Sequence, residues 1–187
     1  MHPKTSYDHR GHNPMQCNWN NKWSYDWNLH YYHWNNRSYN PYYGDMTLQD
    51  YGTRPFVVNI DRATKQNNNY RTALWTGKYF QVTLMSINVG EDIGLEVHPT
   101  TDQFIRIEEG QGFVQMGDRR DYLDFQAMAY DDYAIMIPAG KWHNITNTGN
   151  RPLKVYVIYA PPEHPYGTVH ETKAIAQGTR QVNLALE

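Results

Sequence analysis

Residues 132–147 read DYAIMIPAGKWHNITN, two short apolar runs separated by Pro138-Ala139-Gly140. Short apolar runs that are bounded by Pro, Gly and Asn are typical of β-strands joined by turns. We therefore expect strands at Tyr133–Pro138 and His143–Thr146, with a second turn at 147–150 (NTGN).

The same pattern continues outward from this stretch. Residues 79–89 (YFQVTLMSINV) alternate, with Phe80, Val82 and Leu84 on one face, which predicts a half-buried strand. Short strands at such regular spacing favour an all-β fold, an antiparallel sandwich or barrel. A single helix is expected, around Glu171–Gln177, after the capping-box pattern Thr168-Val169-His170-Glu171. The remaining predicted strands are Gly94–His98, Gln103–Glu109, Gly112–Met116, Phe125–Tyr130 and Leu153–Tyr159.

The composition argues against several classes of protein. The chain has 187 residues, a formal net charge of -2 and one cysteine, Cys17. The near-neutral charge gives no electrostatic case for binding nucleic acid or a membrane surface, and one cysteine allows no intramolecular disulfide. No apolar run approaches the roughly 18 residues of a membrane helix. Residues 1–12 (MHPKTSYDHRGH) show no signal peptide, so we expect a soluble, cytoplasmic protein.

The N-terminal part of the chain has a different composition. Residues 1–45 hold four of the six Trp, seven of the 16 Tyr and five of the nine His, with eight Asn. Aromatic and amide side chains without aliphatic partners do not readily offset the entropy lost on ordering. We predict an arm at 1–48, a barrel domain at 49–163 and a tail with the short helix at 164–187. The arm is either a disordered leader or an adhesive assembly segment.

Three polar residues of the predicted barrel could form a metal site. Glu96 and His98 point to the same face if 94–98 is a strand, because side chains alternate along strands. If the strand that begins at His143 faces this one across the barrel, the three side chains converge. Two imidazoles and one carboxylate can hold a divalent ion and leave positions open. The alternative is a solvated Glu-x-His pair on an outer face and an unrelated histidine.

These residues lie in two stretches that resemble the motifs of the cupin family. In the second motif, a Pro-x-Gly turn is followed by His and Asn; here Pro138-Ala139-Gly140, His143 and Asn147 match it, and Asp132 takes the place of an earlier glycine. In the first motif, a His-x-His pair is followed by Glu and then Gly. Residues 96–110 keep this frame, and the likeness covers about residues 70–160.

The resemblance implies a cupin double-stranded β-helix, a jelly-roll barrel, with a metal at the motif residues. Glu96 replaces the first histidine of the family and Gln103 replaces its glutamate, whereas His98 and His143 are in place. The carboxylate is thus moved rather than lost, and Gln103 could be a weak fourth ligand. This donor set suits one divalent transition metal, Mn²⁺, Fe²⁺, Ni²⁺ or Zn²⁺. The alternative is a cupin barrel whose site has degenerated.

Candidates for other roles are fewer. Tyr133 could line the mouth of the barrel as a catalytic residue, or simply pack there. His170, in the tail, could reach the rim of the pocket as an acid–base group, or could pin the tail to the surface. Arg106 and Lys154 lie in predicted strands and could meet an anionic substrate, although an outer strand face is the ordinary place for such residues.

Two functions are consistent with these residues. The first is a metal-dependent enzyme acting on a small polar or anionic molecule by isomerase, lyase or dioxygenase chemistry. The second is an assembly protein, because the composition of the arm is similar to that of spore-coat or exosporium proteins. In either case we expect a homodimer or a higher homo-oligomer, because open sheet edges invite pairing. Deposition on the spore surface belongs to the second function.

Overall fold

The computed structural model describes the backbone of residues 45–184 and the side chains of residues 45–178. The predicted arm therefore lies almost wholly outside the described residues, and both interpretations of it stay predictions, as do the predicted domain boundaries. Within 45–184, no helix is long and apolar enough to cross a membrane. In chain order the elements are α2 (Ile60–Gln66), β1 (Arg71–Thr76), β2 (Gln81–Ile87), β3 (Asp102–Glu109), β4 (Gly112–Gly117), β5 (Phe125–Ala129), β6 (Ala134–Ile137), β7 (Trp142–Asn147), β8 (Leu153–Ala160), β9 (Val169–His170) and α3 (Lys173–Leu184).

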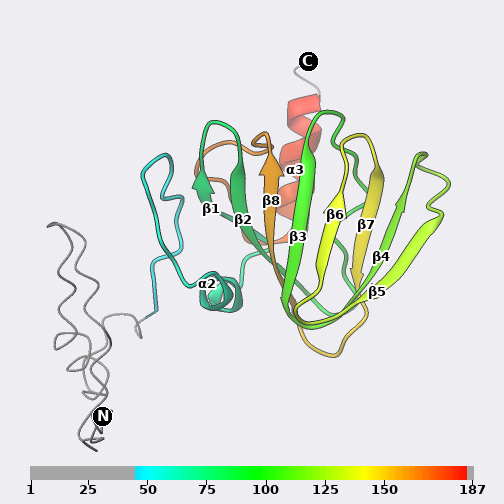
Figure 1. The fold of residues 1–187 in the computed structure, drawn as a ribbon, viewed down its shortest axis with the longest axis horizontal. Helices are drawn as coiled ribbons and strands as arrows, with labels where there is room; N and C mark the ends of the chain where they lie inside the picture. The colour runs from blue at the N-terminus through cyan, green and yellow to red at the C-terminus, as the bar shows by residue number, and fades with distance from the viewer. Residues whose placement is uncertain (1–44, 185–187) are drawn as a thin grey trace, which may run out of the picture. The chain divides into compact units, whose positions relative to one another are not determined.

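The strands form two antiparallel sheets that enclose one core. The larger sheet has the order β6-β3-β8-β2-β1-β9 and the smaller has the order β5-β4-β7. Figure 1 shows β1, β2, β8, β3 and β6 of the larger sheet side by side, with β7, β4 and β5 of the smaller sheet to their right. Ile105 and Val157 of the larger sheet join Val114 and Ile145 of the smaller sheet in one buried cluster. This arrangement confirms the predicted all-β jelly-roll barrel.

Residues 90–98, which form no regular strand, extend the smaller sheet beyond β7. Gly90 N donates a hydrogen bond to Asn147 O, and Ile93 N donates to Ile145 O, both at 3.1 Å. Further along, Glu96 and His143 exchange two main-chain hydrogen bonds of 3.1 and 2.9 Å. The 90–98 segment therefore runs antiparallel to β7, and its buried residues Ile93, Glu96 and His98 face the interior.

Two turns of the second motif require left-handed backbone. Gly140, in the Pro138-Ala139-Gly140 turn before β7, has a φ of 80°. Asp132, which stands where the family has glycine, has a φ of 71°. Asp is among the few residues with a side chain that adopt this conformation at modest cost, so the substitution keeps the turn that leads into β6.

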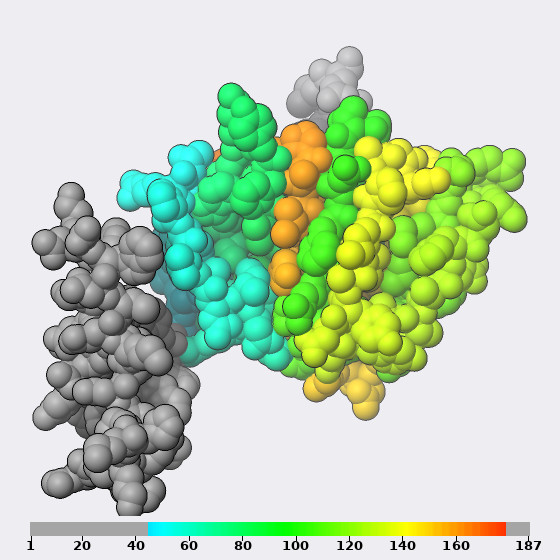
Figure 2. All heavy atoms as spheres, in the orientation of Figure 1, coloured from blue at the N-terminus to red at the C-terminus, as the bar shows by residue number. Residues whose placement is uncertain are grey.

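A second hydrophobic cluster covers the outer face of the larger sheet. Leu74 of β1 and Leu84 of β2 are fully buried against the chain that precedes them, residues 46–60 and α2. Figure 2 shows this preceding chain in cyan beside the strands in green. The helix begins where Asn59 Oδ1 accepts a hydrogen bond from Arg62 N at 3.0 Å. Both faces of β2 are therefore buried, and the prediction of a half-buried strand was wrong.

Other differences from the predicted elements are local. The prediction did not include α2, which is short and rests on its N-cap and on packing rather than on a long amphipathic pattern. It also did not include β1 and β9, which pair with each other. Between Gly94 and His98 only a bridge at Glu96 is formed. The C-terminal helix begins at Lys173, where Ile175 N donates to Thr172 Oγ1 at 3.4 Å, so the box at Thr168 does not cap it.

Candidate metal centre

Glu96, His98 and His143 lie together inside the barrel, and we call them the three-donor group. The main-chain pairing of Glu96 with His143 places these two side by side on the smaller sheet. They are therefore on neighbouring segments and do not face each other across the barrel, as was predicted. One ligand atom from each of the three residues lies within 4.8 Å of the others. The exposed fractions are 5% for Glu96, 4% for His98 and 1% for His143.

The two imidazoles turn the same nitrogen toward the carboxylate. His98 Nε2 lies 3.4 Å from Glu96 Oε1, and His143 Nε2 lies 3.5 Å from the same oxygen. Neither Nε2 atom has a hydrogen-bond partner among the described residues. The two rings are 5.5 Å apart between centroids, with planes inclined at 49°. Three buried donor atoms thus converge on one small region.

The opposite nitrogens of both rings are held by the protein. His143 Nδ1 lies 2.9 Å from the main-chain oxygen of Lys141, and His98 Nδ1 lies 2.9 Å from Glu163 Oε1. An acceptor at Nδ1 favours the tautomer that carries its proton there, which leaves the Nε2 lone pair free for a ligand. This is the arrangement that metal-binding histidines require, because imidazole binds a metal in its neutral form.

The protonation states of the group reflect its burial and its mutual contacts. Burial by itself would raise the pKa of Glu96, but the nearby His143 and His98 and the charge of Arg71 lower that pKa well below its ordinary value. Burial would lower the pKa of His98, but Glu163 and Glu96 raise it to about 9. Glu96 is therefore a carboxylate near neutral pH, and without a ligand His98 carries a proton between two carboxylates.

Gln103 lies on the inner face of β3 and is 3% exposed. It stands in register with Tyr159 of β8 on one side and with Ile137 of β6 on the other. The Tyr159 ring contacts the His98 ring edge to face, with 5.7 Å between centroids, so Gln103 belongs to the same end of the barrel. Its Oε1 has no hydrogen-bond partner among residues 45–178. Its role as a fourth ligand remains a prediction.

The structure does not bring Tyr133 to the three-donor group. β6 runs from Ala134, opposite Arg106, to Ile137, opposite Gln103, and Tyr133 precedes it at the far end. The ring is half exposed and lies edge to face with Tyr130 at 5.6 Å. Tyr133 therefore packs at the other end of the sheet from the candidate ligands.

His170 lies on β9, the strand of the tail that pairs with β1, and it stands in register with Arg71. It is partly buried, and its Nδ1 is buried without a hydrogen-bond partner among the described residues. Burial and the charge of Arg71 lower the pKa of His170 below its ordinary value. His170 is thus within electrostatic reach of the barrel interior, and an acid–base role for it stays a prediction.

Sequence reasoning missed three residues around the group: Arg71, Tyr159 and Glu163. Arg71 and Tyr159 are buried on inward-facing positions of β1 and β8, and His164 contacts Tyr159 edge to face at 5.0 Å. Recognising RTALWT at 71–76 as a strand would have placed Arg71 on a sheet face. No spacing signals Glu163, because it reaches His98 from the irregular chain after β8.

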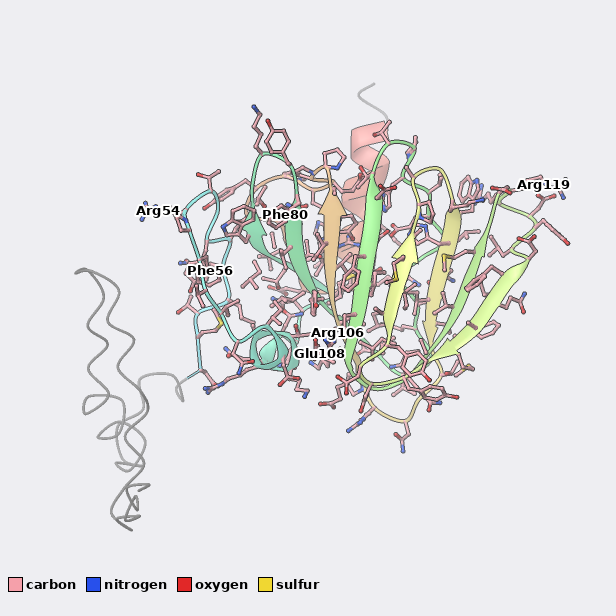
Figure 3. All side chains as sticks on the ribbon, viewed as in Figure 1. Arg54, Phe56, Phe80, Arg106, Glu108 and Arg119 are labelled. Atoms are coloured by element: carbon pink, nitrogen blue, oxygen red, sulfur yellow. The ribbon has the colours of Figure 1, made fainter. Side chains whose placement is uncertain are left out.

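Arg106 and Lys154 occupy positions unrelated to the group. Arg106 Nε lies 3.2 Å from Glu108 Oε1, and Figure 3 shows these two side chains next to each other on β3. Lys154 donates to the main-chain oxygen of Asn67 and to Asn68 Oδ1. Both cations are therefore engaged on the outside of the barrel, where strand Arg and Lys ordinarily lie.

The three-donor group fits a divalent transition metal. Two neutral imidazole nitrogens and one carboxylate oxygen are borderline donors that suit Mn²⁺, Fe²⁺, Ni²⁺ and Zn²⁺, and they do not select one of them. Nε2 atoms that are buried, unpartnered and oriented by contacts at Nδ1 are an arrangement that a bound cation would satisfy. The group is therefore a candidate ligand set with positions left open.

Comparison with known proteins agrees with the fold and the motifs. Residues 83–159 match the family model of the cupin domain, Cupin_2. Uncharacterized protein YrkC of Bacillus subtilis is 69% identical over 132 residues, which is 71% of this chain and 71% of that protein. Uncharacterized protein L612 of Acanthamoeba polyphaga mimivirus is 40% identical over 115 residues, 61% of this chain and 70% of that protein.

A solved structure supports the same assignment. The crystal structure of BH2720 from Bacillus halodurans has 69% sequence identity and a TM-score of 0.69, and the match covers 70% of this chain and 98% of that chain. The barrel, the motif residues and these relatives lead to one conclusion: the chain belongs to the cupin family.

Proposed function

We propose that this cupin domain binds one divalent transition metal ion through Glu96, His98 and His143, with Gln103 as a weak fourth ligand. The observation that carries the proposal is the convergence of two unpartnered Nε2 atoms on one carboxylate inside the barrel. With no ligand between them, the two buried Nε2 atoms of His98 and His143 lack a hydrogen-bond partner among the described residues, which is unfavourable.

The domain would act on a small polar or anionic molecule by isomerase, lyase or dioxygenase chemistry. A bound ion supplies a Lewis acid or an oxygen-binding centre for such reactions. The protein keeps the ligands in place through Glu163 and the Lys141 carbonyl oxygen, and the burial of the ligands keeps water from them. His170 is a candidate on the tail for moving a proton, because its Nδ1 is unpartnered among the described residues and its pKa is lowered.

Metal content tests the proposal directly. The full-length protein, purified without an affinity tag, is compared with Glu96→Ala and His143→Ala by plasma mass spectrometry. His164→Gln serves as the matched control, because His164 is a partly buried histidine that contacts Tyr159 near the group but is not one of the three ligands. The five histidines of residues 1–45 are present in all variants, so their contribution cancels in the comparison.

We expect the wild type and the control to carry about one more ion per chain than the two alanine variants. Equal metal content in all four proteins would contradict the proposal. So would a wild type that takes up no ion on titration with Mn²⁺, Fe²⁺, Ni²⁺ and Zn²⁺.

We also propose that the chain forms a homodimer or a higher homo-oligomer. β6 is an edge strand of the larger sheet and pairs with β3 alone among the described strands. Met136 on β6 is 65% exposed and lies beside Phe104 and Ile158 in a shallow hollow of the outer face. An open strand edge next to exposed apolar side chains favours association with a second copy.

A further inference from the structure

Arg71 is a buried cation with no carboxylate in ion-pair contact among the described residues. It lies on β1 at 6% exposure, and Nη2 contacts Met85 Sδ at 3.9 Å. Its Nε has no hydrogen-bond partner, and no ion pair joins it to a carboxylate, among the described residues. A buried guanidinium is normally paired, because an unpaired buried charge is strongly unfavourable.

The charge of Arg71 acts on both walls of the interior. It lowers the pKa of Glu96 in the three-donor group, although burial opposes this. On the other wall, burial raises the pKa of Tyr159 to about 12, and Arg71 partly offsets that shift. Arg71 adds to the lowering that burial causes in His164 and His170. Geometry places the same groups together, because His170 stands in register with Arg71 and the Tyr159 ring contacts His98 at 5.7 Å and His164 at 5.0 Å.

Hydrogen-bonding groups with unused capacity surround the same region. Thr83 Oγ1, on the inner face of β2, has no partner among the described residues and is fully buried. His164 Nε2 and His170 Nδ1 are likewise buried and unpartnered in this part of the chain. Several polar atoms around one unpaired cation are the features expected of a binding site for a small anion.

The charges give the valence of that anion when the proposed ion is present. Histidine ligands bind a metal in the neutral form, so His98 and His143 contribute no charge. The ion brings two positive charges and Arg71 brings one, against the two carboxylates Glu96 and Glu163. One positive charge remains inside the barrel, and a monoanion would neutralise it.

We propose that Arg71, with the Tyr159 hydroxyl beside it, binds the carboxylate of a small monocarboxylate ligand next to the three-donor group. The planar guanidinium fork matches a carboxylate, and inorganic phosphate, which is largely dianionic at pH 7.5, does not match the single charge. This inference rests on the proposed function, and it adds the residue that recognises the ligand and the chemical class of the ligand.

The test uses the full-length protein loaded with Co²⁺, which reports on its own coordination through visible absorption. Glycolate is titrated by calorimetry and by absorption at pH 7.5. Its uncharged analogue glycolamide and inorganic phosphate are titrated in the same way for comparison. We expect saturable binding of glycolate, and at least tenfold weaker binding of the other two.

Variants assign the effect to Arg71. We expect Arg71→Gln to weaken glycolate binding about 10- to 100-fold, because a charge-assisted hydrogen bond is lost. Arg106→Gln is the matched control, since Arg106 is engaged by Glu108 and Asp132 on the outside of the barrel. It should bind glycolate as the wild type does. Tyr159→Phe removes only a hydroxyl and should weaken binding several-fold, which gives a second variant if Arg71→Gln does not fold.

The outcomes separate this inference from the proposed function. If Co²⁺ binds but the wild type takes up no glycolate, or takes it up equally in Arg71→Gln, the inference is wrong and the metal site stands. If Co²⁺ does not bind, the proposed function fails. The inference rests on that ion and fails with it.

Discussion

Glu163 Oε1 lies 2.9 Å from His98 Nδ1, although Glu163 lies outside the strands, in the chain between β8 and β9. Its other oxygen accepts a hydrogen bond from Thr101 Oγ1 at 3.1 Å. The carboxylate is thus fixed by one contact while it orients the imidazole by the other. Chain that lies outside both sequence motifs therefore decides which nitrogen of His98 faces the interior.

Removing this contact should weaken metal binding without removing a ligand. We expect Glu163→Ala to lower metal affinity about 10- to 100-fold, the usual effect of losing a group that orients a ligand, and Glu163→Gln to restore part of it. Competition with a chelator of known affinity measures the change. Glu171→Ala is the control, because its side chain is exposed on the same tail. Unchanged affinity in Glu163→Ala would show that the contact does not orient His98.

His164 should make the protein less stable as the pH falls. Burial lowers its pKa from 6.5 to about 2, with smaller effects of Arg71, Glu96, His98 and His170. Below pH 6.5 the unfolded chain therefore takes up a proton that the folded chain does not, and stability falls by at most about 1.4 kcal/mol per pH unit. We expect His164→Gln to reduce this loss by up to about 2 kcal/mol at pH 5, relative to pH 8.

Urea unfolding of both proteins between pH 5 and pH 8 checks this prediction. The substitution leaves in place the main-chain bonds of residue 164 with Gln81, which are 2.9 and 3.0 Å long. Parallel stability curves for the two proteins would mean that His164 titrates normally. The raised pKa of His98 has the opposite effect, with stability lost as the pH rises toward 9, and it is common to both proteins.

Asp50 should be important for stability because it joins three parts of the chain. Its Oδ1 accepts from Gly52 N and Thr76 N at 2.9 Å, and its Oδ2 accepts from Thr76 Oγ1 at 2.5 Å and Gly167 N at 3.0 Å. We expect Asp50→Ala to lower the free energy of unfolding by about 3 kcal/mol, since buried donors lose a charged acceptor.

Chemical denaturation followed by tryptophan fluorescence measures that change. Asp45→Ala is the control, because Asp45 is exposed and its ion pair with Arg62 is 3.7 Å long. Its effect should be within about 0.5 kcal/mol. A loss of the same small size in Asp50→Ala would contradict the structural role of Asp50.

The proposed self-association has a simple test. Light scattering on the full-length protein at micromolar concentration should give at least twice the mass of the 22.0 kDa chain. Met136→Lys, which places a charge on the exposed edge strand, should shift the protein toward monomer. Val57→Lys is the control, because Val57 is exposed. Met46→Lys is unsuitable, because Met46 packs in a hydrophobic cluster and its substitution would disturb the fold. A monomeric wild type would disprove the proposal.

The sequence predicted the parts of the fold that depend on short-range pattern. Period-2 alternation and turn residues identify β3, β4, β6 and β7, because each of these strands has one face on the core and one nearer to solvent. In β2 the alternation identified the strand but not the burial of both its faces. At Glu96 a strand was predicted, but the chain there is irregular and forms only a bridge. The pattern also misses α2, whose seven residues are too few to show a helical period.

For the candidate centre, the motif frame identified the three residues that the structure groups, including the displaced carboxylate Glu96. The frame says nothing about residues brought in by tertiary packing. Arg71 comes from β1 before the first motif, and Glu163 and His164 come after the second. Their positions depend on how the tail returns to β1, which no local spacing reports.

The two main-chain bonds between Glu96 and His143 have a consequence for how such an ion would be acquired. Peptide groups, not a cation, set the spacing of these two donors, so the barrel does not need an ion in order to fold. In zinc fingers, by contrast, binding and folding are a single event. Here an ion could enter, leave or be exchanged while the scaffold stays intact, and the species carried would follow the supply of metals in the cell.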